Sequence, residues 1–193
     1  MRKLVYFISL SLDGFIAGPE DQVDFFDGSD DYMQRMVHDY ADLMPHHARV
    51  QLGLSEHSLS RFDTVVMGRR TYEPALAMGM TSPYAHLRQL VFSRTLVSTD
   101  PAVQVIESDP LGTIRSLKSE DSVMDIYLAG GGQLAGVLLP EIDELIIKRY
   151  PVIVGSGLRA FAHGYAPVQF AMVDNLTFAS GNSITRFTPV PQS

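Results

Sequence analysis

The sequence predicts an α/β fold, in which a central mixed, mostly parallel sheet is flanked by helices and ends in an antiparallel hairpin. Short apolar runs rich in branched and aromatic residues recur along the chain, and most lack the polar alternation of strands that face water on one side. Segments with apolar residues at helical spacing separate several of these runs, as in βα units. The last two runs are joined by four turn-forming residues, which is typical of a hairpin.

The strands are predicted from the apolar runs in chain order. Six runs form the body of the sheet, two form the final hairpin, and a glycine-containing connection separates the two groups. The six are residues 4–10, 64–67, 89–92, 103–106, 125–128 and 144–150, the connection is residues 154–167, and the hairpin strands are residues 169–178 and 183–189.

Three helices are predicted from apolar spacing and from residues that favour helix ends. The first begins after Ser29, a suitable N-cap, and has acidic residues in its first turn, where they complement the helix dipole. The second is capped by Asp109 and runs to about residue 117, and the third ends before Pro140. The apolar stripes are Met33, Met36, Val37, Tyr40 and Met44 in the first helix and Leu134, Val137 and Leu138 in the third.

Composition limits the class of protein. With 193 residues, 46% hydrophobic and 19% charged, we expect one domain over residues 1–193 with a packed core. The chain has no cysteine, which excludes disulfides, thiolate-bound metals and thiol nucleophiles and fits a cytoplasmic protein. The net charge of −7 opposes binding to nucleic acid over a broad face. Residues 4–12 are interpreted as a strand rather than a signal peptide, and no apolar run reaches the ~20 residues of a membrane span.

The strongest local motif is a strand that runs into three consecutive glycines at the start of a helix, within residues 127–135. Glycines let a backbone approach a diphosphate, and the free amides and dipole of the following helix attract the anion. Gly130, Gly132 and Ala135 match the loose dinucleotide fingerprint, but they come late in the chain and antiparallel strands follow. The motif therefore predicts phosphate binding without a Rossmann fold, and a glycine turn with no ligand is the alternative.

Two further strand ends carry cationic and hydroxyl side chains, and Thr71 is expected to cap a short helix after the first of them. Because ligands of α/β sheets bind beyond the carboxyl ends of the strands, we expect these groups and the glycine loop to form one site for a nucleotide with several phosphates. Guanidinium groups suit phosphate oxygens, although each arginine taken singly has a solvated or salt-bridged alternative. The groups are Gly68, Arg69, Arg70 and Thr71 after one strand, and Ser93 and Arg94 after the next.

Two other clusters are rejected as catalytic sites. The pair His46 and His47, with Glu56 and His57, is not expected to bind a metal, because adjacent residues on a helix point about 100° apart. Residues 155–157 lack the strand-to-helix elbow of a hydrolase nucleophile. No metal ligand is therefore predicted.

Four segments in this order, residues 11–18 (SLDGFIAG), 66–73 (VMGRRTYE), 93–95 (SRT) and 128–134 (LAGGGQL), carry a resemblance. The chain resembles the dihydrofolate reductase-like superfamily, specifically the stand-alone relatives of the reductase domain of bifunctional riboflavin-pathway deaminase-reductases. The resemblance covers nearly the whole chain, to about residue 189, including the antiparallel ending.

The resemblance implies an NADPH-dependent reductase that transfers a hydride to a small pterin-like or ribosylaminopyrimidine-like substrate. NADPH would lie extended across the sheet edge, and the peptide between Gly130 and Gly131 would be cis. The implied cofactor contacts are Gly68, Arg69, Arg70 and Thr71 at the phosphates, Ser93 and Arg94 at the 2′-phosphate, Gly130, Gly131, Gly132, Gln133 and Leu134 at the diphosphate, and Ser9, Ile16 and Ala17 beside the nicotinamide.

The sequence also departs from these families. It has no tryptophan, which dihydrofolate reductases commonly carry in the loop after the first strand, and residues 21–26 occupy that stretch. Phe15 lies where the riboflavin-pathway enzymes often have a charged residue. Four acids compete to orient the substrate, and Asp31, in the first turn of the first helix, is favoured as the catalytic carboxylate. The others are Asp24, Asp27 and Asp30.

These departures leave other functions open. The main alternative is a nucleotide-binding or regulatory module of the same fold without turnover, and a hydrolase or transferase is weaker because no nucleophile–base pair stands out. A homodimer is expected, since residues 145–154 and 154–167 offer surface and twofold dimers are the commonest oligomers.

Overall fold

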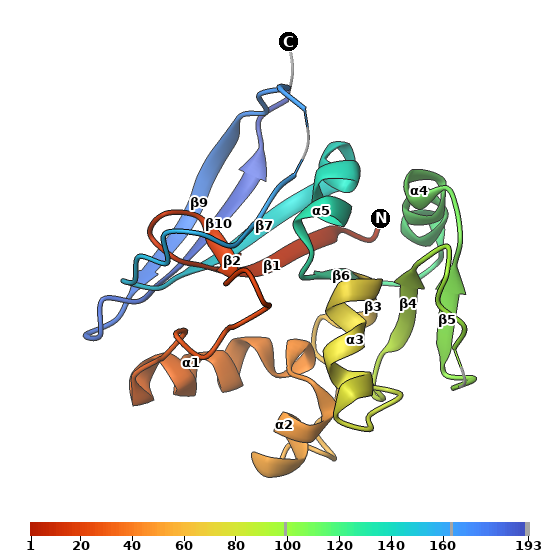
Figure 1. Cartoon of the computed structure of the whole chain (residues 1–193), viewed down its shortest axis with the longest axis horizontal. Helices are drawn as coiled ribbons and strands as arrows, with labels where there is room; N and C mark the ends of the chain where they lie inside the picture. The colour runs from red at the N-terminus through yellow and green to blue at the C-terminus, as the bar shows by residue number, and fades with distance from the viewer. Residues whose placement is uncertain (99, 163, 192–193) are drawn as a thin grey trace.

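One eight-stranded sheet runs through the computed structural model, which describes residues 1–98, 100–162 and 164–191 (Figure 1). The strand order is β5-β4-β3-β6-β1-β7-β10-β9. The first six strands in this order are parallel to one another, and β10 is antiparallel to both β7 and β9. The predicted mixed, mostly parallel sheet with an antiparallel ending is confirmed.

Every predicted strand is present, with ends that differ from the prediction by at most two residues. The strands are β1 Leu4–Leu10, β3 Phe62–Gly68, β4 Arg88–Phe92, β5 Val103–Ile106, β6 Asp125–Ala129, β7 Ile142–Arg149, β9 Phe170–Thr177 and β10 Ser183–Pro189. A second, antiparallel sheet of β2 Phe15–Ala17 and β8 Leu158–Arg159 was not predicted, because strands of two or three residues carry no periodicity.

The helices follow the prediction in position but not in every boundary. They are α1 Asp30–Tyr40, α2 His46–Gln51, α3 Arg69–Ala77, α4 Pro110–Ser119 and α5 Gly132–Leu138, with short 3₁₀ turns η1 Ala41–Leu43 and η2 Leu139–Glu141. None of the helices in the described part of the chain is long and apolar enough to cross a membrane.

Two details of the helix prediction were wrong. In α1 the buried line is Tyr32, Met36 and Tyr40, spaced four apart, so Met33 points about 100° away and is 43% exposed. Thr71 does not cap α3, because the helix already begins at Arg69 with Gly68 as its N-cap.

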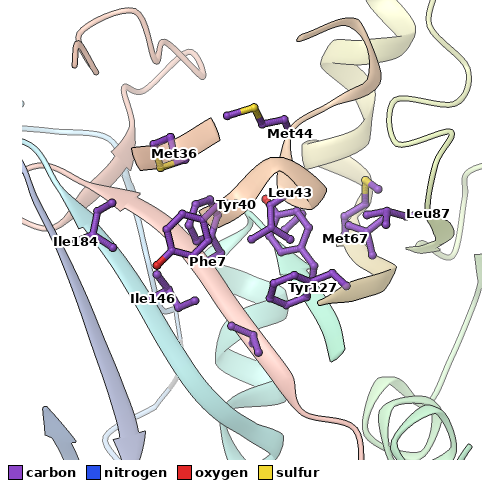
Figure 2. Packing of buried hydrophobic residues seen from close by; sticks show 14 of the residues in the cluster. Phe7, Met36, Tyr40, Leu43, Met44, Met67, Leu87, Tyr127, Ile146 and Ile184 are labelled. Atoms are coloured by element: carbon purple, nitrogen blue, oxygen red, sulfur yellow. The ribbon is translucent and has the colours of Figure 1, made fainter. Parts of the chain in front are cut away.

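The core has two halves, one on each face of the sheet. In β1, Val5 and Phe7 point to one face and Leu4 and Tyr6 to the other, and all four are buried. The first face packs against α1 and α3, and Figure 2 shows Phe7 below Tyr40 in that cluster. The second face packs against α4 and α5, which lie across the sheet from α1 and α2 in Figure 1. A strand covered on both faces cannot alternate, which explains the continuous apolar runs.

Charged side chains at the amino ends of the parallel strands are paired with one another. Arg2 bonds Asp63 and Glu120, and Lys118 bonds Asp143 at 2.7 Å. The buried carboxylate of Glu144 accepts from Arg61 at 2.8 Å and from Arg186 at 2.9 Å. Burial alone would raise the pKa of Glu144, but these hydrogen bonds outweigh it and hold the pKa below its ordinary value.

Replacing Glu144 should therefore destabilise the fold. Glu144→Gln leaves Arg186 without its anion and Arg61 with Asp125 alone, and should lower the free energy of unfolding by about 3 kcal/mol, measured by urea denaturation. Glu73→Gln is the matched control, because Glu73 pairs with Arg69 on the exposed surface of α3 and should cost about 0.5 kcal/mol or less. Equal losses in the two variants would contradict this account.

Asp42 and His86 form a buried polar contact beneath the start of β3. One carboxylate oxygen of Asp42 accepts backbone N–H groups from Ser60, Arg61 and Phe62 at 2.8–3.1 Å. The Nε2 of His86 bonds the carbonyl oxygen of Asp42 at 2.8 Å, and its buried Nδ1 has no partner in the described residues. Burial lowers the pKa of His86 below its ordinary 6.5.

Acid should therefore weaken the fold through His86. A histidine whose folded pKa is lowered binds its proton more readily when unfolded, so the free energy of unfolding should fall as the pH drops below about 6.5. Urea denaturation at pH 7.5 and 5.5 should show a larger loss in the wild type than in His86→Gln. The exposed His47→Gln serves as the control and should keep the wild-type difference; a His86→Gln protein that loses as much would refute the assignment.

Candidate nucleotide site

The predicted phosphate-binding segments meet at the carboxyl edge of the sheet. Gly68 ends β3, Ser93 follows β4 and Gly130 follows β6, and these three strands are adjacent and parallel. A Cβ on Gly130 would lie 2.8 Å from Oγ1 of Thr71, so the glycine loop touches the first turn of α3. The Nη1 of Arg69 donates to Oγ1 of Thr95 at 3.0 Å, which joins α3 to the segment after β4.

The glycine loop turns sharply into α5. Gly130 and Gly131 have φ of 56° and 64°, a conformation that favours glycine. No peptide bond in the described residues is cis, so the expectation of a cis Gly130–Gly131 bond was wrong; two successive positive φ angles make the turn instead. A Cβ on Gly132 would overlap the carbonyl oxygen of Arg159, so the connection before β9 packs directly on this loop.

The first turn of α5 presents backbone amides, not side chains. Its N-cap, Gly131, offers no capping side chain, and the first amides of a helix have no acceptor inside it. Gln133 is exposed, whereas the side chain of Leu134 is buried in the core beneath the sheet. Leu134 therefore contributes to the loop only through its backbone.

The three predicted arginines differ in their partners. Arg69 bonds Glu73 and Thr95, and Arg70 bonds Asp21 at 2.9 Å. Arg94 is exposed and makes no hydrogen bond or ion pair to any residue that the structure describes. The carboxyl edge thus presents a cation with no counter-charge, unlike the paired amino edge.

The remaining predicted cofactor residues have mixed surroundings. The Ser93 hydroxyl accepts from the amides of Thr95 and Leu96, so it shapes the turn that presents Arg94. Ser9 is half-buried near the end of β1. Ile16 and Ala17 are buried in β2, where Ile16 shares a core cluster with Leu134.

Asp31 lies at another part of the carboxyl edge, beside the turn between β9 and β10. It is exposed, hydrogen-bonds the hydroxyl of Ser29 and accepts from the amide of Tyr32 at 2.9 Å. The Ser29 hydrogen bond lowers the pKa of Asp31. The backbone of Ala179, in the turn between β9 and β10, also hydrogen-bonds Asp31, and no hydrogen bond or ion pair among the described residues joins Asp31 to the glycine loop or α3.

Asp21 is a site residue that the sequence did not single out. It follows β2, has φ of 63°, and reaches across to Arg70 at the start of α3. A lone aspartate in a loop carries no local signal for a partner 49 positions away. Among the described residues, no group of three or more histidine, aspartate or glutamate side chains is placed to hold a metal ion.

Solved structures share this fold. A putative riboflavin biosynthesis protein from Shewanella sp. PV-4 matches with a TM-score of 0.70 and 20% identity, over 98% of this chain and 99% of that one. A diaminohydroxyphosphoribosylaminopyrimidine deaminase/5-amino-6-(5-phosphoribosylamino)uracil reductase from Thermotoga maritima matches at 0.67 and 16%, over 98% of this chain but 57% of that one. Dihydrofolate reductase from Enterococcus faecalis, complexed with NADP(H), matches at 0.62 and 14%, over 97% and 96%.

The chain therefore has the fold of dihydrofolate reductase and of the riboflavin-pathway reductase structures. The chain is 32% identical over 166 residues to the uncharacterized protein YwjB of Bacillus subtilis, covering 83% of each chain, and it belongs to the same family as that protein. The uncharacterized protein YyaP of the same organism is 24% identical over 193 residues, covering 93% of this chain and 91% of that one. No protein-family model matches the chain.

Gly132, in the first turn of α5, and Gly68, at the end of β3, should respond differently to an added methyl group. Gly132→Ala should lower the free energy of unfolding by about 2 kcal/mol, because its Cβ meets backbone that has no room to move. Gly68→Ala should change it by less than about 0.5 kcal/mol, because Gly68 has φ of −85° and open space around its Cβ. Urea denaturation checks both, and an equally stable Gly132→Ala protein would rule out the close approach to Arg159.

Proposed function

We propose that this chain is an NADPH-dependent reductase that transfers a hydride to a small heterocyclic substrate, pterin-like or ribosylaminopyrimidine-like. The observation that carries the proposal is the meeting of three phosphate-binding features at one sheet edge: the Gly130–Gly132 loop, the first turn of α3, and unpaired Arg94. Two of the solved structures with this fold, a reductase of a phosphoribosylaminouracil and a dihydrofolate reductase complexed with NADP(H), support the same chemistry.

The residues at this edge fit a dinucleotide. A Cβ on Gly68 would meet nothing within 4 Å, so the chain leaves open space beside the glycine loop. Backbone amides at the start of α5 and the guanidinium groups of Arg69 and Arg70 would bind the diphosphate. Arg94, beyond the end of β4, would bind the 2′-phosphate, and Ser9, Ile16 and Ala17 would line the nicotinamide.

The protein's part in the reaction would be to bind NADPH and the substrate and to orient them for hydride transfer. When bound, NADPH supplies the hydride, which carries two electrons, and the apolar walls from Ile16 and Ala17 would exclude water from the transfer. Asp31 stays our prediction for the carboxylate that orients the substrate ring. It would need to turn from Ser29 to do so.

A screen of NADPH oxidation tests the proposed activity. Dihydrofolate, dihydropterins and ribosylaminopyrimidinone should be tried as substrates, with NADPH binding measured separately by calorimetry. Oxidation with at least one of them is expected. Binding of NADPH without oxidation would favour the alternative, a regulatory module, and absence of NADPH binding would refute both.

Arg94 should select the phosphorylated cofactor. Charge-assisted hydrogen bonds are worth about 1.5–3 kcal/mol, so Arg94→Ala should weaken NADPH binding about tenfold to hundredfold and leave NADH binding unchanged. Arg88→Ala, at the opposite end of β4 and paired with Glu120, is the control and should leave both dissociation constants unchanged. Equal affinities of the wild type for the two nucleotides would show that the assignment is wrong.

Asp21 should compete with the cofactor for Arg70. Its carboxylate holds the guanidinium that would otherwise face a phosphate, so Asp21→Asn should strengthen NADPH binding about twofold to fivefold, the value of an exposed ion pair. Glu20→Gln removes the same charge one position earlier, where no arginine is bound, and should have a smaller effect. An unchanged or weaker affinity in Asp21→Asn would mean that the pair does not oppose binding.

A further inference from the structure

Lys148 lies at the carboxyl end of β7, next to the predicted nicotinamide position. It is in register with Ser9 of β1 and with Ile184 of β10, so its side chain rises from the face that α1 covers. Its Nζ lies 4.1 Å from the centre of the Phe7 ring. Figure 2 shows Phe7, Ile146 and Ile184, which come from the three adjacent strands β1, β7 and β10.

The ammonium group of Lys148 has no polar partner among the residues that the structure describes. The chain has three lysines; Lys3 is exposed, and Lys118 is paired with Asp143. Lys148 is half-buried, yet it makes no hydrogen bond or ion pair to any residue that the structure describes. Burial lowers its pKa to about 7. The hydroxyl of Ser9, opposite Lys148 in the register, is likewise without a hydrogen bond in the described residues.

The charged groups on the surrounding elements are engaged elsewhere or face water. On α1, Asp39 binds Arg35 and His38, while Asp31 binds Ser29. On β7 and β10, Glu144 binds Arg61 and Arg186, and Arg149 is exposed. The fold therefore supplies Lys148 with an aromatic face but no anion.

A half-buried ammonium group without a partner lowers the free energy of unfolding. An apolar residue at this strand position would not have that cost. The contact with Phe7 offsets only part of that cost. A half-buried polar group without a hydrogen-bond partner is a candidate ligand contact, because a bound ligand can supply the missing hydrogen bond. The ammonium group of Lys148 has donors only and the hydroxyl of Ser9 can also donate, so the group that binds Lys148 must present an acceptor.

We propose that Lys148 is the substrate-binding cation of this site and donates a hydrogen bond to a carbonyl oxygen on the edge of the substrate ring. This inference rests on the proposed reductase function and narrows its substrate. The ring edge facing Lys148 and Ser9 carries oxygen acceptors, as in a pyrimidine- or pteridine-2,4-dione, and not the two amino groups of a 2,4-diamine.

Two probes of the same shape test the inference. Calorimetry in the presence of saturating NADPH should show that the wild type binds pteridine-2,4-dione at least tenfold more tightly than 2,4-diaminopteridine. Lys148→Met should weaken dione binding at least tenfold and leave diamine and NADPH binding unchanged. Lys148→Arg keeps a cationic donor and should restore part of the dione affinity, while Lys3→Met is the matched control and should match the wild type.

Lys148→Met should also be at least as thermally stable as the wild type, which separates a binding role from a folding role. In protein with ¹³C-dimethylated lysines, adding the dione should shift the Lys148 resonance and not those of Lys3 or Lys118. Wild-type protein that binds NADPH but prefers the diamine, or binds neither probe, overturns the inference. So does a Lys148→Met protein with unchanged dione affinity. Failure to bind NADPH at all would instead overturn the proposed function.

Discussion

The placement of β1 between β6 and β7 is the constraint on which the rest of the structure depends. All three strands are parallel, and β1 is buried on both faces. Parallel neighbours end at one edge, so the chain must leave the sheet there after every strand and return through a helix or loop. That requirement gathers the segments after β3, β4 and β6 into one place, although they are far apart in sequence.

The two edges of the sheet differ in how their cationic side chains are paired. At the amino edge, Arg2, Arg61 and Lys118 are paired with carboxylates, and the buried carboxylate of Glu144 is hydrogen-bonded by two arginines. At the carboxyl edge, Arg94 and Lys148 have no anionic partner in the described residues. Pairs at one edge stabilise the fold, whereas unpaired cations at the other are available to a ligand. The net charge of −7 does not describe this local distribution.

The site was only partly visible in the sequence, and the limits have physical causes. The sequence singled out Gly130, Gly68 and Arg94 because glycines and arginines at strand ends are local signals. The close approach of Arg159 to Gly132 and the pairing of Asp21 with Arg70 are contacts across long sequence separations that no spacing encodes. Asp31 was chosen from its place in a helix turn, and the structure gives its carboxylate local partners instead.

The sequence by itself determined the strands of the large sheet, the two-sided burial of its central strands and the antiparallel ending, because apolar periodicity follows directly from which side chains must leave water. It did not determine the buried line of α1, where the choice between Tyr32 and Met33 depended on how the helix lies on the sheet. Nor did it distinguish Lys148 from any other cation in an apolar strand. Only the tertiary structure decided that this ammonium group lies over Phe7, opposite Ser9 and beyond reach of every carboxylate in the described residues, because partners are set by packing between elements and not by neighbours in the chain.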